Sequence, residues 1–293
     1  YPLRRQRQMC IRDRPNNGGY HDDSIDIQID ITYWTQDLQQ VDAPGEGTTT
    51  VMSARVKLTD VSQFRTGFAN KYPSKQARHV NDMTKRFNAV MGIDGDYCLY
   101  HEQGIVVRNG RTLRMRPHKG RDELIVDENG DFHLITCTTQ AKWDEYIAGG
   151  GTVLHAFCFG PALVVDGVPL TSLDDVTIDN GKAKKAQRMV IGQIGKLEYL
   201  ILTNEGPEST APKSVGFDLV QMANLCVQFG LDNAYNLDGG SSSTIALNNQ
   251  KINSPSSHKN RMVGDCIWFA TLVKEETWRE KESVQTVEVE DNK

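Results

Sequence analysis

A short apolar segment of the chain leads directly into acidic, glycine and hydroxyl residues, a combination that could carry out chemistry. Residues 234–237 suit a strand, and Asp238, Gly239, Gly240 and four hydroxyl residues follow them. Two adjacent glycines allow positive φ and a close approach of the backbone to a ligand. Successive N–H groups in such a turn can form an anion-binding nest. The stretch therefore predicts a carboxylate beside an anion site, with a polar surface turn as the alternative.

Further acids and an arginine lie where other strands are expected to begin or end. Asp94 and Asp96 flank a glycine and share one face of an extended segment, so they could act as acid and base or bind a divalent cation. Arg188 opens an apolar strand, and its planar guanidinium suits phosphate or carboxylate. Glu205 ends the returning strand and could be a general acid or base. Solvated turns and a structural salt bridge are the alternatives for these residues.

The remaining candidates are small, amide or hydroxyl residues together with a second arginine. They offer hydrogen-bond donors for phosphate and an amide to orient a substrate. They are Asn236, Gly239, Gly240, Ser241, Ser242, Asn253 and Arg261.

Several common classes of site are absent from the sequence. None of the 7 histidines has the spacing of a metal-binding HExxH motif, and no two of the 6 cysteines form a CxxC pair. There is no GxSxG, Walker or GxGxxG motif. The formal net charge of -5 argues against a nucleic-acid surface. No apolar run approaches the roughly 20 residues of a membrane span.

Hairpins dominate the elements that would position these residues. Alternating apolar residues predict strands at 25–31 and 48–58. Asp60 could cap a short helical turn, and helices are expected at 74–87, with Ser74 as N-cap, at 143–148 and at 216–229. Further strands are expected at 89–98, 105–108, 124–126, 132–135, 155–165, 188–192, 197–202, 234–237, 244–247 and 262–273. The pattern predicts a mixed α+β fold with mainly antiparallel sheets, a few packed helices and a single catalytic domain.

The two ends of the chain are set apart from this domain. Residues 1–14 resemble translated sequencing-adapter sequence or a disordered segment, and without them the formal charge is -9. Residues 15–88 are expected to supply N-terminal strands and a helix to the same domain. Residues 89–273 form its core, and residues 274–293 form a charged tail.

Ordered blocks of this sequence resemble the phosphodiester glycosidase family, in a bacterial-type form. The blocks are residues 92–98, 159–167, 187–192, 202–206, 236–244, 253–256 and 261–263. The most specific is Asn236 to Thr244, NLDGGSSST, which is similar to the family's NLDGGGSST. Departures also occur: Asp94 stands where the family usually has Asn, and Asn204–Glu205 stands in place of Val-Asp.

The resemblance implies a hydrolase that cleaves the glycosidic bond of a sugar-1-phosphodiester, on a glycan or cell-envelope polymer. It implies a carboxylate role for Asp238, with Asp94, Asp96 and Glu205 as rivals. Arg188 and Arg261 would hold phosphate. It also implies a carbohydrate or sugar-phosphate substrate and a secreted or extracytoplasmic location.

Two other functions remain open from the sequence. One is a phosphodiesterase that cuts the P–O bond, and the other is a non-catalytic module that binds glycan or phosphate. No cofactor is expected, although a structural divalent cation such as calcium stays open.

Overall fold

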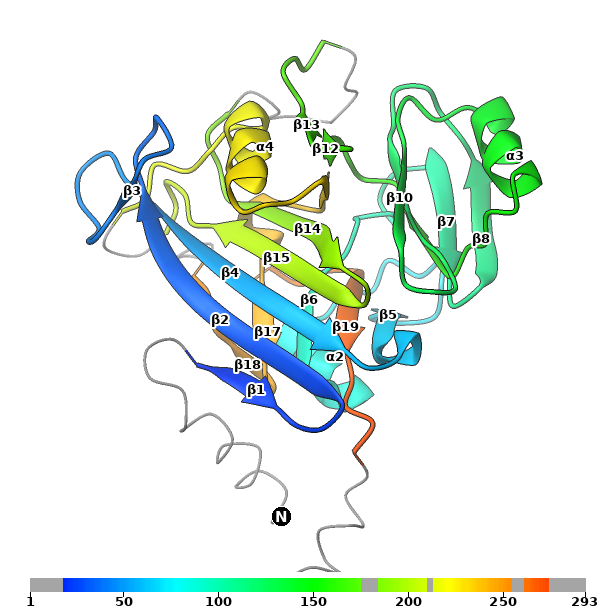
Figure 1. The fold of residues 1–293 in the computed structure, drawn as a ribbon. Helices are drawn as coiled ribbons and strands as arrows, with labels where there is room; N and C mark the ends of the chain where they lie inside the picture. Colours follow the sequence, from blue (N-terminus) through cyan, green and yellow to red (C-terminus); the bar gives the residue numbers. More distant parts are fainter. Residues whose placement is uncertain (1–17, 175–183, 210–212, 255–260, 274–293) are drawn as a thin grey trace, which may run out of the picture.

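Residues 18–174, 184–209, 213–254 and 261–273 are described in the computed structural model (Figure 1). Within these ranges the chain forms three sheets and three α-helices, and every strand pair given for them is antiparallel. The predicted α+β architecture is therefore confirmed. The predictions for residues 1–14 and 274–293 lie outside the described residues. No helix in these ranges has the length and apolar character needed to cross a membrane.

The largest sheet has nine strands. In spatial order they are β1 (Gly19–His21), β2 (Ile25–Trp34), β4 (Thr49–Leu58), β15 (Glu198–Asn204), β14 (Arg188–Gly195), β16 (Asn233–Asn236), β12 (Ala162–Val165) and β13 (Val168–Pro169), with β3 (Gln40–Val41) beside β2. The N-terminal strand β4 pairs along its length with β15, so the early and late parts of the chain share one sheet. Helix α4 (Leu219–Gln228) packs on β12 of this sheet.

A second sheet of five strands stands at one side of the molecule (Figure 1). Its order is β10 (Phe132–Ile135), β9 (Glu123–Val126), β11 (His155–Phe157), β7 (Gly104–Arg108) and β8 (Arg111–Arg116). Asn109 and Gly110 both have positive φ between β7 and β8, which confirms the predicted tight turn. Trp143 of helix α3 (Gln140–Ala148) is buried against this sheet.

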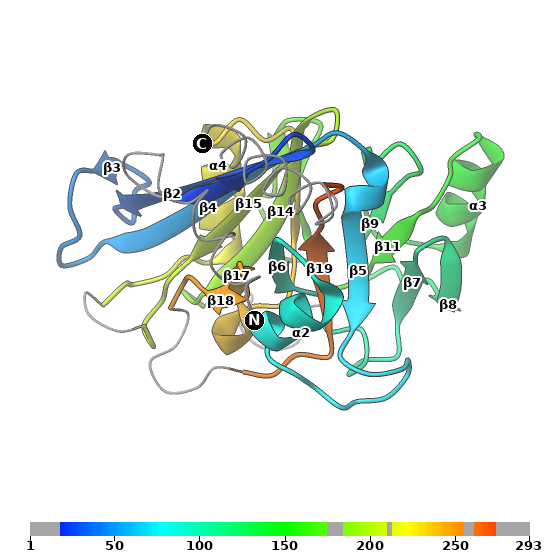
Figure 2. The same cartoon turned by 90° about the horizontal axis from the view of Figure 1, so that it is seen from below.

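The third sheet brings together strands from three distant parts of the sequence. Its order is β18 (Gln250–Lys251), β17 (Ile245–Leu247), β6 (Met91–Asp94), β19 (Asp265–Phe269) and β5 (Phe64–Phe68). Figure 2 shows β6, β19 and β5 side by side, with helix α2 (Val80–Phe87) next to them. The main apolar core joins this sheet to the large one, through side chains such as Ile27, Ile93, Ile191 and Phe269.

Several predicted elements differ from their expected bounds. The strand predicted at 89–98 is limited to β6, and the segment 155–165 forms two strands, β11 and β12, in different sheets. The helix predicted at 74–87 begins only at Val80, because Arg78 is held extended by two backbone hydrogen bonds with Val263, of 3.0 and 2.8 Å. The strand predicted at 262–273 is limited to Asp265–Phe269. By contrast, Asp60 caps the short 3-10 helix η2 (Val61–Gln63), as predicted, with a hydrogen bond from the Ser62 N–H.

Candidate active site

Three of the four predicted acids, Asp94, Asp96 and Asp238, lie where β6 and β16 end and β19 begins. The Asp238 N–H donates to the Gly95 carbonyl at 3.1 Å, which ties the end of β16 to the end of β6. The Gly95 N–H donates to the Asp265 carbonyl at 3.1 Å, which ties the same turn to β19. Three segments that are far apart in sequence therefore converge on one small region.

Asp238 is the acid in this region that keeps contact with solvent. It is 8% exposed, and its Oδ1 accepts a hydrogen bond of 2.9 Å from the Gly239 N–H. Burial raises the pKa of Asp238, and the nearby charge of Asp96 adds to this. The Ser242 hydroxyl, Arg261 and the Gly239 N–H oppose the rise because they favour the charged carboxylate.

Asp94 lies behind Asp238 and has no solvent exposure. Its Oδ1 accepts a 2.9 Å hydrogen bond from the Thr244 N–H, whereas its Oδ2 has no hydrogen-bond partner among the described residues. Burial and the charge of Asp238 hold the pKa of Asp94 well above its usual range. The two acids are therefore unequal, because Asp94 lacks the cation and the hydroxyl that favour the charged form of Asp238.

The turn after Asp238 differs from the predicted anion nest. The Gly240 N–H donates to the Gln187 carbonyl at 3.0 Å, and the Ser242 N–H donates to the Gly239 carbonyl at 3.3 Å. The Gly239 N–H is taken by Asp238 itself. Only the Ser242 N–H is used within the 3-10 helix η3 (Gly240–Ser242); the other two N–H groups bond to Gln187 and to the Asp238 side chain. Gly239, Gly240 and Ser241 are half-exposed, so they form the surface that a ligand would meet.

Arg261 is exposed, and its charge favours the charged form of Asp238, although these two described residues do not form an ion pair. Its Nη2 donates to the Tyr97 hydroxyl at 3.4 Å, and its guanidinium carbon lies 5.3 Å from the centroid of the Tyr97 ring. One of the two arginines predicted to bind phosphate is therefore near enough to the predicted carboxylate to lower its pKa.

Arg188 has a different set of partners. Its Nε donates to the Phe217 carbonyl at 3.3 Å, and its Nη2 donates to the Lys184 carbonyl at 2.6 Å. Burial lowers the pKa of Arg188 to about 10, and Asp218, the N-cap of α4, opposes this. These contacts place the guanidinium near the start of α4, apart from the contacts of Arg261.

Asp96 belongs to a buried ion cluster. The Nη2 of Arg108 lies 2.8 Å from Asp96 and 3.1 Å from Asp265, and all three side chains are nearly inaccessible to solvent. Burial alone would raise the pKa of Asp96, but the Arg108 guanidinium and a hydrogen bond from the Cys158 N–H hold it below its usual range. Burial and the charge of Asp96 raise the pKa of Asp265 to about 7.

The same cluster contains the one metal-like grouping found among the described residues. Single ligand atoms of Asp96, Cys98 and Asp265 lie within 4.8 Å of one another. The Arg108 guanidinium already supplies the positive charge at this place, with its Nη2 3.8 Å from the Cys98 sulfur. These residues therefore do not fit a divalent cation, because the cation would compete with a buried arginine.

The other predicted residues lie around this region with their own partners. Asn253 accepts from the Ile245 N–H at 2.8 Å and donates to the Ser243 carbonyl at 2.7 Å, so it braces the turn. Asn236 donates to the Gly160 carbonyl at 2.8 Å. Glu205 is half-buried; burial raises its pKa, while a backbone N–H of Ser254 and the charge of Lys251 oppose the rise.

Sequence reasoning missed Tyr97, Arg108 and Asp265. Arg108 could have been noticed, because a charged residue ends the apolar run Ile105–Val107. The role of Asp265 depends on the pairing of β19 with β6, and the position of Tyr97 depends on its backbone conformation. Neither feature has a local signal in the sequence.

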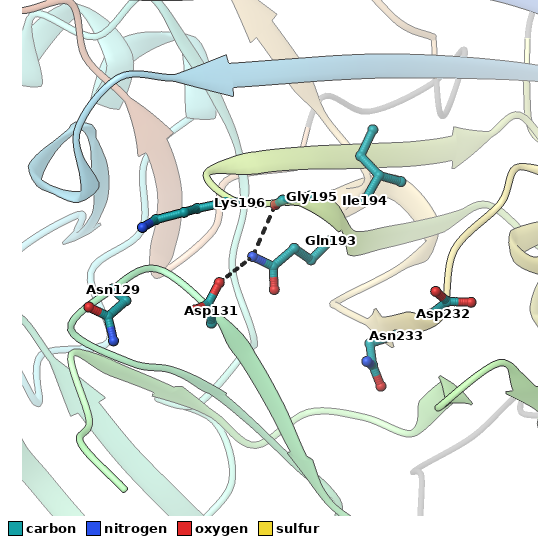
Figure 3. A pocket seen from close by; sticks show the side chains of 8 residues that line it. All are labelled: Asn129, Asp131, Gln193, Ile194, Gly195, Lys196, Asp232 and Asn233. Carbon is teal, nitrogen blue, oxygen red and sulfur yellow. Dashed lines mark hydrogen bonds between the residues drawn. The ribbon is translucent and has the colours of Figure 1, made fainter.

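Two hollows on the surface of the described residues lie elsewhere. One, of about 530 Å³, is lined by the turn at Asn129–Asp131, the end of β14 at Gln193–Gly195, and Asp232–Asn233 (Figure 3). Within it, the Gln193 amide donates to Asp131 at 3.0 Å, so two of its polar groups are bonded to each other. The other, of about 460 Å³, lies by His133 and the end of α3. We place the candidate site at Asp238 because the unequal acids and the exposed guanidinium are there.

Comparison with solved structures identifies the fold. Zebrafish N-acetylglucosamine-1-phosphodiester alpha-N-acetylglucosaminidase, as a catalytic domain auto-inhibited by its pro-peptide, has a TM-score of 0.62 and 14% identity over 86% of this chain and 85% of that chain. A hypothetical protein from Synechocystis has a TM-score of 0.56 and 13% identity over 87% and 64%. A Burkholderia pseudomallei protein named as exported has a TM-score of 0.53 and 15% identity over 78% and 75%. At such identities the likeness shows the fold alone.

Sequence comparison identifies the family. No curated protein sequence matches this chain. The family model described as phosphodiester glycosidase matches residues 87–270, which is more than half of the chain and includes Asp94, Asp238, Arg261 and the ion cluster. The chain therefore belongs to the phosphodiester glycosidase family.

Proposed function

We propose that this protein hydrolyses the glycosidic bond of a sugar-1-phosphodiester, with Asp238 as the reacting carboxylate. The observation that carries the proposal is one grouping of three unequal side chains. Asp238 is slightly exposed, Asp94 is buried with a strongly raised pKa, and Arg261 is an exposed guanidinium beside Asp238. The family of the chain supports the reaction class.

In the proposed reaction the guanidinium holds the anionic group and the carboxylate acts at the sugar. The diester phosphate carries one negative charge, which suits the planar fork of Arg261. When the bond from C1 to the phosphate oxygen breaks, its electron pair moves to the phosphate and positive charge develops on the sugar. The Asp238 carboxylate supports that charge and accepts one proton from the attacking water. The products are the free sugar and a phosphate monoester.

Asp94 acts in this proposal as a positioning residue. It has no exposure, so it does not touch substrate. Its bond to the Thr244 N–H holds the turn that follows Asp238. Burial and the charge of Asp238 raise the pKa of Asp94 well above its usual range, which favours its neutral form.

The other predicted residues take supporting roles. We assign Asp96 to the ion cluster, and Asn236 and Asn253 to bracing the backbone. The half-exposed Gly239, Gly240 and Ser241 would contact substrate, and Ser242 would help to close the turn through its N–H, which donates to the Gly239 carbonyl. Glu205 and Arg188 stay outside the reacting group, since their contacts lead to Lys251 and to the start of α4.

An assay with one matched control tests the role of Asp238. The substrate is a hexose or N-acetylhexosamine joined at C1 to an alkyl phosphate diester, and release of free sugar is measured. We expect Asp238→Asn to lower kcat by about 10²–10⁴-fold, because it removes the base and the charge. Asp232→Asn is the control, since Asp232 is exposed at the start of β16. Equal kcat values for a folded Asp238→Asn variant and the unchanged protein would show that Asp238 is not the reacting carboxylate.

We also propose a glycan or cell-envelope polymer outside the cytoplasm as the natural substrate. The name of the Burkholderia pseudomallei structure as an exported protein supports this location. Fractionation of the native host, followed by immunoblotting, tests it. Protein confined to the cytoplasmic fraction would count against this location.

A further inference from the structure

The turn that follows Asp96 holds an aromatic residue in an unusual backbone conformation. Tyr97 has a φ of 56°, in the left-handed region that bulky side chains rarely adopt. Such outliers persist only where the surrounding structure determines them, and they cluster at functional sites. Here the Tyr97 carbonyl accepts a 3.1 Å bond from the Tyr100 N–H, and the two rings stack with centroids 4.5 Å apart.

The neighbouring segments fix this aromatic pair from two sides. The edge of Tyr97 meets Phe159, with centroids 6.5 Å apart. A Cβ at Gly264 would lie 2.6 Å from Leu99 and 3.4 Å from Tyr100, so the glycine lets the chain just after Arg261 lie directly against the turn. The turn and the segment that carries Arg261 are therefore packed together.

The contacts of Arg261 run to this turn. Its guanidinium lies 5.3 Å from the Tyr97 ring centroid and donates to the Tyr97 hydroxyl at 3.4 Å. Without such contacts an exposed arginine samples many rotamers, and its ordering on binding a ligand costs free energy. A guanidinium that is fixed against an aromatic ring can direct its other N–H groups towards an anion.

We infer that Tyr97 is a positioning residue for Arg261, and that this pair forms the subsite for the diester phosphate beside Asp238. The inference rests on the proposed function and names the residue that gives the phosphate site its geometry. The ligand of this subsite would be a phosphate diester that carries a single negative charge and is attached to a sugar.

The inference connects Tyr97 to the acidity of Asp238. Four charged or titratable groups are near enough to Asp238 to interact with it electrostatically: Asp94 of β6, Asp96 and Tyr100 of the turn after β6, and Arg261. Arg261 is the cation among these that favours the charged form of Asp238. If Arg261 leaves its place, the pKa of Asp238 rises further.

Three substitutions at Tyr97 and one control test this. We expect Tyr97→Leu to raise KM for the sugar-1-phosphodiester about tenfold, and to move the acidic limb of the kcat/KM profile to higher pH. Tyr97→Phe keeps the ring and should stay within about twofold of the unchanged protein. Tyr97→Asn, which tolerates the left-handed backbone, should behave like Tyr97→Leu and covers the case in which leucine impairs folding. Tyr33→Leu, at a half-buried tyrosine of β2, is the control.

The outcomes separate this inference from the proposed function. Unchanged KM and an unchanged acidic limb in folded Tyr97→Leu and Tyr97→Asn would overturn the inference, and so would equal damage from Tyr97→Phe. If the unchanged protein releases no sugar, calorimetric binding of the intact sugar-1-phosphodiester is measured instead. Binding that is weakened by Tyr97→Leu but not by Tyr33→Leu supports the subsite alone. Equal binding by both variants, or none by the unchanged protein, overturns it.

Discussion

Asp94 and Asp238 show how two identical side chains acquire different roles from their surroundings. Both are buried, and burial favours the neutral form of each. Asp238 also faces Arg261 and the Ser242 hydroxyl, which favour its charged form. Asp94 faces the charge of Asp238 instead, so its proton is retained more strongly. The surroundings therefore favour the neutral form more strongly for Asp94 than for Asp238.

This difference predicts an unequal response to the same substitution. Asp94→Asn replaces a carboxyl whose pKa is raised by burial with a neutral amide, whose oxygen can still accept from the Thr244 N–H. We expect kcat/KM at neutral pH to stay within about threefold, in contrast to the loss expected for Asp238→Asn. Steady-state kinetics of the two variants side by side make the comparison. A loss of similar size in both would mean that Asp94 also has to be charged.

At the residue scale the sequence predicted part of this arrangement. Asp94, Asp238 and Arg261 were recognised as candidates, and the structure brings them together. The hydrogen-bond partners of the Arg188 guanidinium and of the Gly239 and Gly240 N–H groups were not predicted, because they depend on the tertiary structure. The Gly240 N–H donates to the Gln187 carbonyl, and the Arg188 Nε donates to the Phe217 carbonyl. Both contacts join segments that are far apart in the sequence.

At the scale of elements, the turn between β6 and the second sheet is held by a buried arginine. Arg108 ends β7 and reaches Asp96 after β6 and Asp265 at the start of β19. One guanidinium therefore fixes three elements around the turn that carries Tyr97. A Cβ at Gly95 would lie 2.3 Å from the Asp265 carboxylate, so glycine is needed at the centre of this junction.

The cluster predicts how stability depends on pH. The pKa of Asp265 is raised to about 7 in the folded state, so between about pH 4 and 7 the folded chain keeps a proton that the unfolded chain releases. Stability should therefore fall as pH rises through this window. In Asp265→Asn this fall should shrink, because the amide cannot ionise. For a chain of this size, each 1 kcal/mol corresponds to roughly 2–4 °C in Tm.

Thermal unfolding of the two proteins from pH 4 to 8 measures the effect. We expect the difference in Tm between them to move by several degrees in favour of Asp265→Asn as pH rises, from the same scale. Asp131→Asn, at an acid of the β9–β10 turn, serves as a control. Parallel curves for Asp265→Asn and the unchanged protein would show that Asp265 does not hold this proton.

Local patterns predicted most elements but not all of their limits. The turns at Asn109–Gly110 and Asn248–Asn249 have positive φ at both residues, as their sequences suggest. Helix α4 ends before Gly230, whose φ is 78°, which agrees with a glycine after the last turn. The late start of α2 was missed because the pairing of Arg78 with Val263 is a long-range contact.

At the scale of the whole molecule, the site exists only where two sheets meet. Asp238 follows β16 of the large sheet, whereas Asp94 ends β6 of the third sheet, which also contains β5 and β19. The fold class could be predicted from the number of hairpins. The order of the strands could not, because β6 pairs with β17 and β19, which lie more than 140 residues further along the chain. The apolar core between the sheets sets the relative position of the acids.

The most direct test of the central claim follows oxygen from labelled water into the products. The unchanged protein is incubated with a hexose 1-phosphodiester in H₂¹⁸O, and both products are analysed by mass spectrometry. Free hexose incubated in H₂¹⁸O without protein measures the spontaneous exchange of label into the sugar, and this amount is subtracted. If water adds at C1, as proposed for Asp238 and Arg261, the enzymatic label appears in the sugar and the phosphate monoester carries none. Label in the phosphate product would instead show cleavage of the P–O bond, and would contradict a glycosidase mechanism at this site.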